Sequence, residues 1–105
     1  MDSYNSKLLH YLSTGFDQDM LDRIAGLAAA LTPICEIAAL LDLNEDMLRL
    51  AINDRTSPVR NVYLKAKAET ALKLRKQEIE LAEVGSPLAV QLTSTYLRDM
   101  QADED

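Results

Sequence analysis

Apolar residues recur along much of the chain at intervals of three and four positions. Residues 18–31 are an example, with apolar side chains at Met20, Leu21, Ile24, Leu27, Ala28 and Leu31. This spacing places the side chains on one face of an α-helix. No segment alternates apolar and polar residues with the period of two that a half-buried strand would have. The pattern therefore predicts an all-α protein.

Residues that favour helix ends divide this pattern into segments. Each of the three prolines follows a hydroxyl residue, in Thr32-Pro33, Ser57-Pro58 and Ser86-Pro87. A hydroxyl oxygen can accept a bond from a free N–H at a helix start, and proline fits the first helical position. Asp17 and Asn44 are further capping residues, and Gly15 and Gly85 favour helix ends. The sequence thus predicts helices at about residues 5–13, 18–31, 33–41, 45–53, 58–84 and 87–100, followed by a frayed acidic tail.

The segment EIAALLDLNEDMLRLAI, residues 36–52, has the apolar spacing of a helix-turn-helix. Ala38 is the small residue at the point where the second helix crosses the first. Asp42 stands in the turn, where glycine is usual, and aspartate tolerates a left-handed conformation better than most residues. The residues expected to be buried in this unit are Ile37, Ala38, Leu41, Leu43, Leu48 and Ala51.

The exposed residues at the start of the second helix do not decide whether this unit binds DNA. Glu45 and Asp46 stabilise the helix dipole, but they would repel the phosphates of DNA. Arg49 and Asn53 are the evident candidates for contacts with base edges. Two interpretations remain: a DNA reader, or a helical pair that has only the shape of one.

Charge is distributed in three blocks. Residues 1–54 hold three basic and nine acidic side chains, residues 55–76 hold seven basic and one acidic, and residues 77–105 hold one basic and seven acidic. The middle block could meet DNA phosphates, the acidic helix of a neighbouring subunit, or solvent alone. The residues predicted to bind DNA are Asn44, Arg49, Asn53, Arg55, Arg60, Lys65, Lys73, Arg75 and Lys76.

The predicted helix 58–84 carries apolar residues in two stripes, which is more than one neighbouring helix needs. We therefore expect one contact within the chain and another with a second subunit; a single intrachain core is the alternative. The residues predicted to mediate oligomerisation are Tyr63, Leu64, Ala68, Leu72 and Ile79. The predicted organisation is a helix-turn-helix head (1–54), a long-helix oligomerisation region (55–100) and an acidic tail (101–105).

The sequence offers no evident active site. His10 is the single histidine, and Cys35, the single cysteine, is expected to be a buried small side chain. A glycine-rich phosphate loop is missing, so we expect no catalytic residue, no metal site, no cofactor and no enzyme. The apolar runs are shorter than the roughly 20 residues that cross a bilayer. A lone cysteine and an N-terminus without a secretory signal suit a cytoplasmic protein.

Over residues 20–100, the chain resembles the small subunit of bacteriophage terminases, the DNA-packaging enzymes. The resemblance begins with LTPICEIAALLDLNEDMLRLAI, which is similar to that family's helix-turn-helix, and continues with a long charged helix. That helix ends in Ala82-Glu83-Val84-Gly85 and is followed by a short helix with Tyr96-Leu97-Arg98. The resemblance implies an oligomeric, non-catalytic protein of a bacterial host cell that recognises viral DNA and delivers it to a separate large subunit.

Three functions therefore stand as hypotheses. The first is an oligomeric adaptor of the small-terminase kind, which binds double-stranded DNA and partners a motor subunit. The second is a helix-turn-helix transcription regulator that dimerises through its long helix. The third is a helical protein-interaction module that never contacts nucleic acid.

Overall fold

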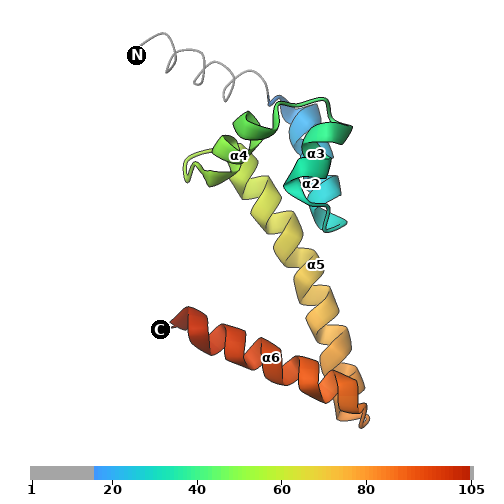
Figure 1. Cartoon of the computed structure of the whole chain (residues 1–105). Helices are drawn as coiled ribbons and strands as arrows, with labels where there is room; N and C mark the ends of the chain where they lie inside the picture. Colours follow the sequence, from blue (N-terminus) through green and yellow to red (C-terminus); the bar gives the residue numbers. More distant parts are fainter. Residues whose placement is uncertain (1–15, 105) are drawn as a thin grey trace. The chain divides into compact units, whose positions relative to one another are not determined.

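The computed structural model describes residues 16–104, and the chain is helical through most of that range. The helices are α2 (Gln18–Ala29), α3 (Ile34–Leu40), α4 (Glu45–Asn53), α5 (Pro58–Glu83) and α6 (Pro87–Glu104) (Figure 1). Residues 16–104 contain no strand, so the predicted all-α class is confirmed. The predicted helix 5–13, with His10, and the helix end at Gly15 lie outside the described residues.

Side chains cap the helix starts as the sequence predicts, with one exception. The caps that form are Asp17, Asn44, Ser57 and Ser86, each of which accepts a backbone N–H from two or three residues ahead. The predicted cap at Thr32 is wrong, because α3 begins at Ile34 and has no side-chain cap. The N–H of Thr32 instead donates to the carbonyl of Leu27, so this residue completes the end of α2 rather than the start of α3.

Three helices end in a residue with a left-handed backbone. These residues are Leu31 (φ 59°), Asp42 (φ 55°) and Gly85 (φ 97°). In each case the following N–H donates to a carbonyl five residues back, which satisfies an acceptor that the helix leaves free. The turns at Asp42 and Gly85 were predicted, but the one at Leu31 was not. It ends α2 at Ala29, two residues earlier than the sequence predicts.

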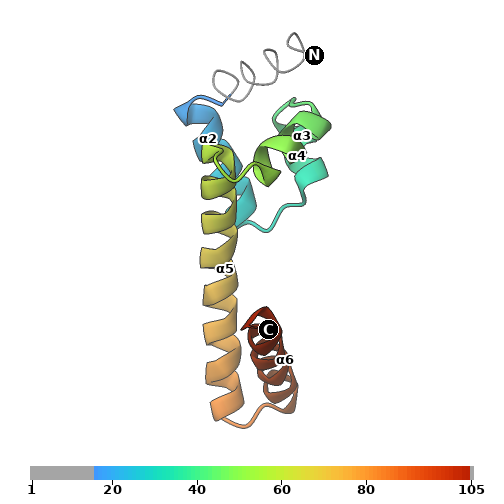
Figure 2. The same cartoon turned by 90° about the vertical axis from the view of Figure 1, so that its left-hand side faces the viewer.

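The chain divides into two compact units, and the described part of the first is residues 16–70. This unit has a true core, formed by Phe16, Ile24, Ala28, Ile37, Ala38, Leu48, Ala51, Ile52, Val59 and Tyr63. Figure 2 shows α2 beside the first turns of α5, and the hydroxyl of Thr70 donates to the carbonyl of Ala29 at 2.6 Å. The unit extends beyond residue 54 because α5 supplies Val59 and Tyr63 to this core.

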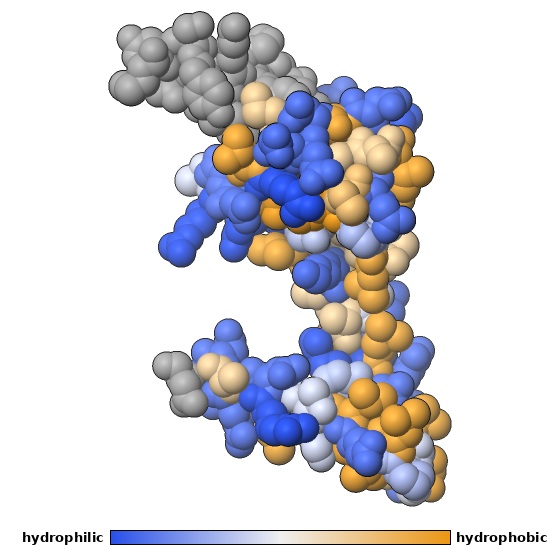
Figure 3. All heavy atoms as spheres, viewed as in Figure 1, coloured by the Kyte–Doolittle hydropathy of each residue, from blue (hydrophilic) through white to orange (hydrophobic). Residues whose placement is uncertain are grey.

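The second unit covers residues 71–105, of which the last is not described. It consists of the second half of α5, a turn at Gly85, and α6. Among its described residues only Ala89 is buried. Figure 3 shows apolar side chains at its surface around the turn. Residues 101–104, predicted to be a frayed tail, continue α6 to Glu104, so this prediction is wrong.

Candidate functional site

The α3–α4 pair has the geometry of a helix-turn-helix. Ile37, Ala38, Leu48 and Ala51 are all buried, as the sequence predicts. Leu41 and Leu43 are partly buried and pack against the same core. Between the helices, the left-handed conformation of Asp42 lets the N–H of Leu43 donate to the carbonyl of Ala38 at 2.9 Å. The small Ala38 side chain therefore lies at the corner, where a larger one would separate the two helices.

The exposed face of α4 carries the predicted DNA contacts and two carboxylates. Glu45, Asp46, Arg49 and Asn53 are all exposed. The Nε of Arg49 lies 3.1 Å from Oε2 of Glu45, with each side chain 47% exposed. The guanidinium that was predicted to contact DNA is thus paired within its own helix. A pair this exposed adds little stability and can open when a stronger partner approaches.

The other predicted contacts of this unit lie after α4 or cap it. Asn44 is exposed, and its Oδ1 accepts the N–H of Met47 at 3.0 Å. Arg55, in the loop before α5, and Lys65, on α5, are both exposed. Arg60 is half-buried, and its Nη1 donates to the carbonyl of Ile52 at 2.9 Å. This bond ties the end of α4 to α5, and the predicted DNA contact of Arg60 stays a prediction.

The loop that carries Arg55 is ordered by its neighbours. Oδ1 of Asp54 accepts the backbone N–H of Thr56 at 3.0 Å and the Thr56 hydroxyl at 2.8 Å. These two bonds favour the ionised carboxylate and lower the pKa of Asp54 below its ordinary value. The carboxylate thereby fixes the backbone on both sides of Arg55.

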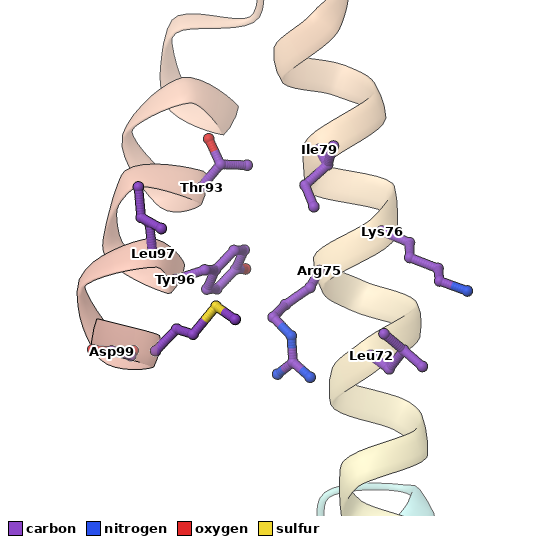
Figure 4. Close-up of a pocket in the computed structure, with 9 residues that line it drawn as sticks. Leu72, Arg75, Lys76, Ile79, Thr93, Tyr96, Leu97 and Asp99 are labelled. Carbon is purple, nitrogen blue, oxygen red and sulfur yellow. The ribbon is translucent and has the colours of Figure 1, made fainter. Parts of the chain in front are cut away.

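The remaining predicted DNA contacts belong to the second unit, so the predicted set is divided between the two units. Lys73 is exposed on α5. Arg75 and Lys76 line an apolar groove between the second half of α5 and α6, with a volume of about 630 Å³. We call this cavity the α5–α6 groove. In Figure 4, Arg75 reaches toward α6, whereas the ammonium group of Lys76 extends away from it.

The α5–α6 groove also contains part of the predicted oligomerisation surface. Leu72 and Ile79 line it, and each is 45% exposed. Across from them, α6 contributes Tyr96, Leu97 and Met100 (Figure 4). No residue of α6 was among the predicted site residues, although its apolar residues four positions apart were a usable signal.

The other oligomerisation residues lie on the first half of α5. Leu64 and Ala68 are exposed, so they remain available to a second copy. Tyr63 is only 8% exposed and belongs to the core of the first unit, so it leaves little surface for a second copy. The ammonium group of Lys67 lies 5.8 Å from the centre of its ring.

The described residues offer little for covalent or metal chemistry. Cys35 is exposed, so the prediction of a buried thiol is wrong. Within residues 16–104, no three His, Cys, Asp or Glu side chains gather as potential metal ligands. None of the described helices combines the length and hydropathy that crossing a membrane would require.

The structure thus has two candidate binding surfaces. One is the exposed face of α4 with the loop that follows it, and the other is the α5–α6 groove. Comparisons of the chain with protein-family models, curated proteins and solved structures found no match.

Proposed function

We propose that this protein is a non-catalytic helix-turn-helix adaptor that binds double-stranded DNA through its first unit and self-associates through its second. The observation that carries the proposal is the α3–α4 corner at Asp42. That corner buries one face of α4 against the core and leaves the opposite face exposed along the helix. A helix presented in this way is the element that helix-turn-helix proteins place in the major groove.

The charges of the first unit favour weak binding that depends on salt. Arg49, Arg55 and Lys65 are the exposed cations of the predicted set in this unit. Three phosphate contacts would give a slope of about −3 in a plot of log K against log salt. Glu45 and Asp46 oppose this attraction at the start of α4, so the expected affinity is lower than that of a basic recognition helix.

The resemblance to small terminase subunits extends the proposal to a biological task. In this form, the protein recognises viral DNA in the cytoplasm of a bacterial host and delivers it to a packaging motor. A transcription regulator would use the same DNA contact, so the number of copies in solution separates the two: many copies favour the packaging adaptor, and two favour the regulator.

Neutralising Glu45 tests the DNA contact directly. The change Glu45→Gln releases Arg49 from its 3.1 Å pair and removes one repulsive charge. We expect the affinity for a 30-base-pair duplex of arbitrary sequence to rise by about three- to tenfold at low salt, measured by fluorescence anisotropy.

The chain contains a matched control for this change. Asp19 and Arg23 form a second exposed pair of the same spacing, also at 3.1 Å, but on α2. The variant Asp19→Asn makes the same change in net charge away from α4, and it should leave the affinity unchanged. An equal gain from both variants would show that net charge alone acts, and the proposed contact through α4 would be wrong.

A second function is favoured by a specific observation. The two carboxylates at the start of α4, together with the pairing of Arg49, suit a helical module that contacts only proteins. In that case neither variant binds DNA, and the wild-type protein shows no retention even at about 50 mM salt, where phosphate contacts are strongest.

A further inference from the structure

The second unit has no core of its own. Of its described residues only Ala89 is buried, although α6 and the second half of α5 carry many large apolar side chains. Leu88 is 66% exposed, Leu97 is 56% exposed and Met100 is 62% exposed. Because most of the stability of protein helices comes from packing an apolar face, two helices left in this state need a further partner.

Part of this exposed apolar surface is gathered at one place. Nine large apolar side chains of this unit are between 44% and 81% exposed. Four of them, Leu72, Ile79, Leu97 and Met100, line the α5–α6 groove together, and the other five lie outside it. Apolar side chains that cluster at an exposed surface in this way usually mark an interaction site.

The charges around the α5–α6 groove indicate which partner fits. Arg75, Lys76 and Asp99 line the groove, and Asp103 and Glu104 follow on the last turn of α6. Within residues 16–104 the ion pairs are Arg23–Asp19 and Arg49–Glu45, both in the first unit. Arg75 and Lys76 are therefore unpaired with the carboxylates of α6 in the single chain, even though Asp99 lines the same groove.

We propose that the α5–α6 groove receives α6 from a second copy of this chain. The exposed apolar side chains of the incoming α6 pack against Leu72 and Ile79, and its terminal carboxylates approach Arg75. Each copy both supplies the helix and receives one, so the apolar surfaces and the opposite charges are satisfied together. The inference rests on the self-association in the proposed function and is independent of DNA contact.

Placing a charge in the groove tests the apolar part of the contact. We expect Ile79→Glu to weaken association of the full chain by at least about a hundredfold, because the carboxylate would be buried against apolar side chains. The measurement is sedimentation velocity across a range of protein concentrations, without DNA.

Leu74 provides the control, since it lies on α5 outside the groove and is 44% exposed, close to the 45% of Ile79. Leu74→Glu should keep most of the association. A wild-type protein that is monomeric throughout, or an equal loss from both variants, would overturn the proposal.

A charge exchange tests whether the two helices come from different copies. We expect Arg75→Glu, and separately the double change Asp99→Lys with Asp103→Lys, to weaken self-association by about tenfold. Mixing these two proteins should restore association, with both species in one complex when each carries a different tag. Lys73→Glu, on the same helix but outside the groove, is the control and should have little effect.

Failure to recover association in the mixture would contradict the contact between α6 and Arg75. The outcome also separates the two proposals. Assembly without DNA retention would reject the DNA contact and leave this inference standing, whereas DNA retention by a monomer would do the reverse.

Discussion

The two units of this chain contain similar apolar residues, but they bury the side chains to different extents. In the first, side chains such as Ile24, Ile37 and Leu48 have no exposed surface. In the second, leucines of the same size are close to half exposed or more, as Leu81 at 49% and Leu88 at 66% illustrate. The difference does not lie in hydrophobic content, and it follows from how the apolar positions are arranged around each helix.

Helix α4 gathers most of its apolar residues on one face, where the core covers Leu48, Ala51 and Ile52, and leaves only Leu50 largely exposed. The second half of α5 has no such face. Leu72 and Ile79 point to the α5–α6 groove, whereas Leu74 and Leu81 lie outside it. A helix with apolar residues on opposite sides cannot be covered by one neighbour. The same continuous helix can therefore pack in a core at Tyr63 and line the open α5–α6 groove at Ile79.

The largest expected effect separates the units by their response to truncation. Leu48→Ala removes a fully buried side chain, and we expect it to lower the free energy of unfolding by about 3 kcal/mol. Leu81→Ala, at a half-exposed position, should lower it by less than about 1 kcal/mol. Urea denaturation followed by circular dichroism at low protein concentration measures both. An equal loss of unfolding free energy in the two variants would show that Leu81 is as well packed as Leu48, and the contrast drawn between the units would be wrong.

A smaller effect is expected at the residues with a left-handed backbone that follow the helices. The first unit has Leu31 at such a position, and the second has Gly85. Leu31→Gly relieves a backbone that leucine adopts with strain, and its side chain is 47% exposed, so we expect a gain of about 1 kcal/mol. Gly85→Ala should cost about 1 kcal/mol, because a Cβ there meets no atom within 4 Å and the penalty is conformational alone. Thermal unfolding measures both changes. A loss of stability in Leu31→Gly would mean that its side chain packs more than its exposure indicates.

The smallest effect concerns the loop after α4. Thr56→Val removes one of the two bonds that lower the pKa of Asp54, so that pKa should rise part of the way to its ordinary value, as measured by NMR titration of the carboxyl carbon. Because the pKa is lowered in the folded chain, the associated stability is present above the unfolded pKa and is lost as pH falls through the folded value.

The same titration also tests whether the first unit is independent of self-association. Asp54 belongs to the first unit, so its low pKa should persist on dilution even if the second unit dissociates from its partner. Thr32→Val, at a threonine that forms no cap, is the control and should leave the pKa of Asp54 unchanged. A pKa that drifts with protein concentration would show that the first unit depends on association too.

Much of the fold could be predicted because its signals are local. The bounds of α4 follow from Asn44 and the apolar residues behind it, and the end of α5 follows from Gly85. Failures occurred where two signals competed for one residue. Thr32 precedes a proline, as a cap should, but its N–H closes α2 because Leu31 adopts a left-handed backbone that leucine rarely takes.

The candidate surfaces were harder to predict because they depend on which face each helix turns inward. Helix α3 has only seven residues, and with Ile37 and Ala38 buried, Cys35 falls on the outer side. Arg60 has the sequence signature of a phosphate contact, yet the acceptor it uses is the backbone carbonyl of Ile52, which no side-chain pattern marks. Tyr63, which was predicted to contact a second copy, packs in the core of the first unit, and the periodicity of α5 does not mark which of its faces that core covers.

The exposed thiol of Cys35 has a practical consequence for every experiment on this chain. It is the only cysteine, so a maleimide dye would attach at one known position, the start of α3, without any mutation. The same accessibility lets two molecules join covalently in an oxidising buffer. Measurements of mass therefore need a reductant or a Cys35→Ser background, so that a covalent dimer is not mistaken for assembly through helix packing.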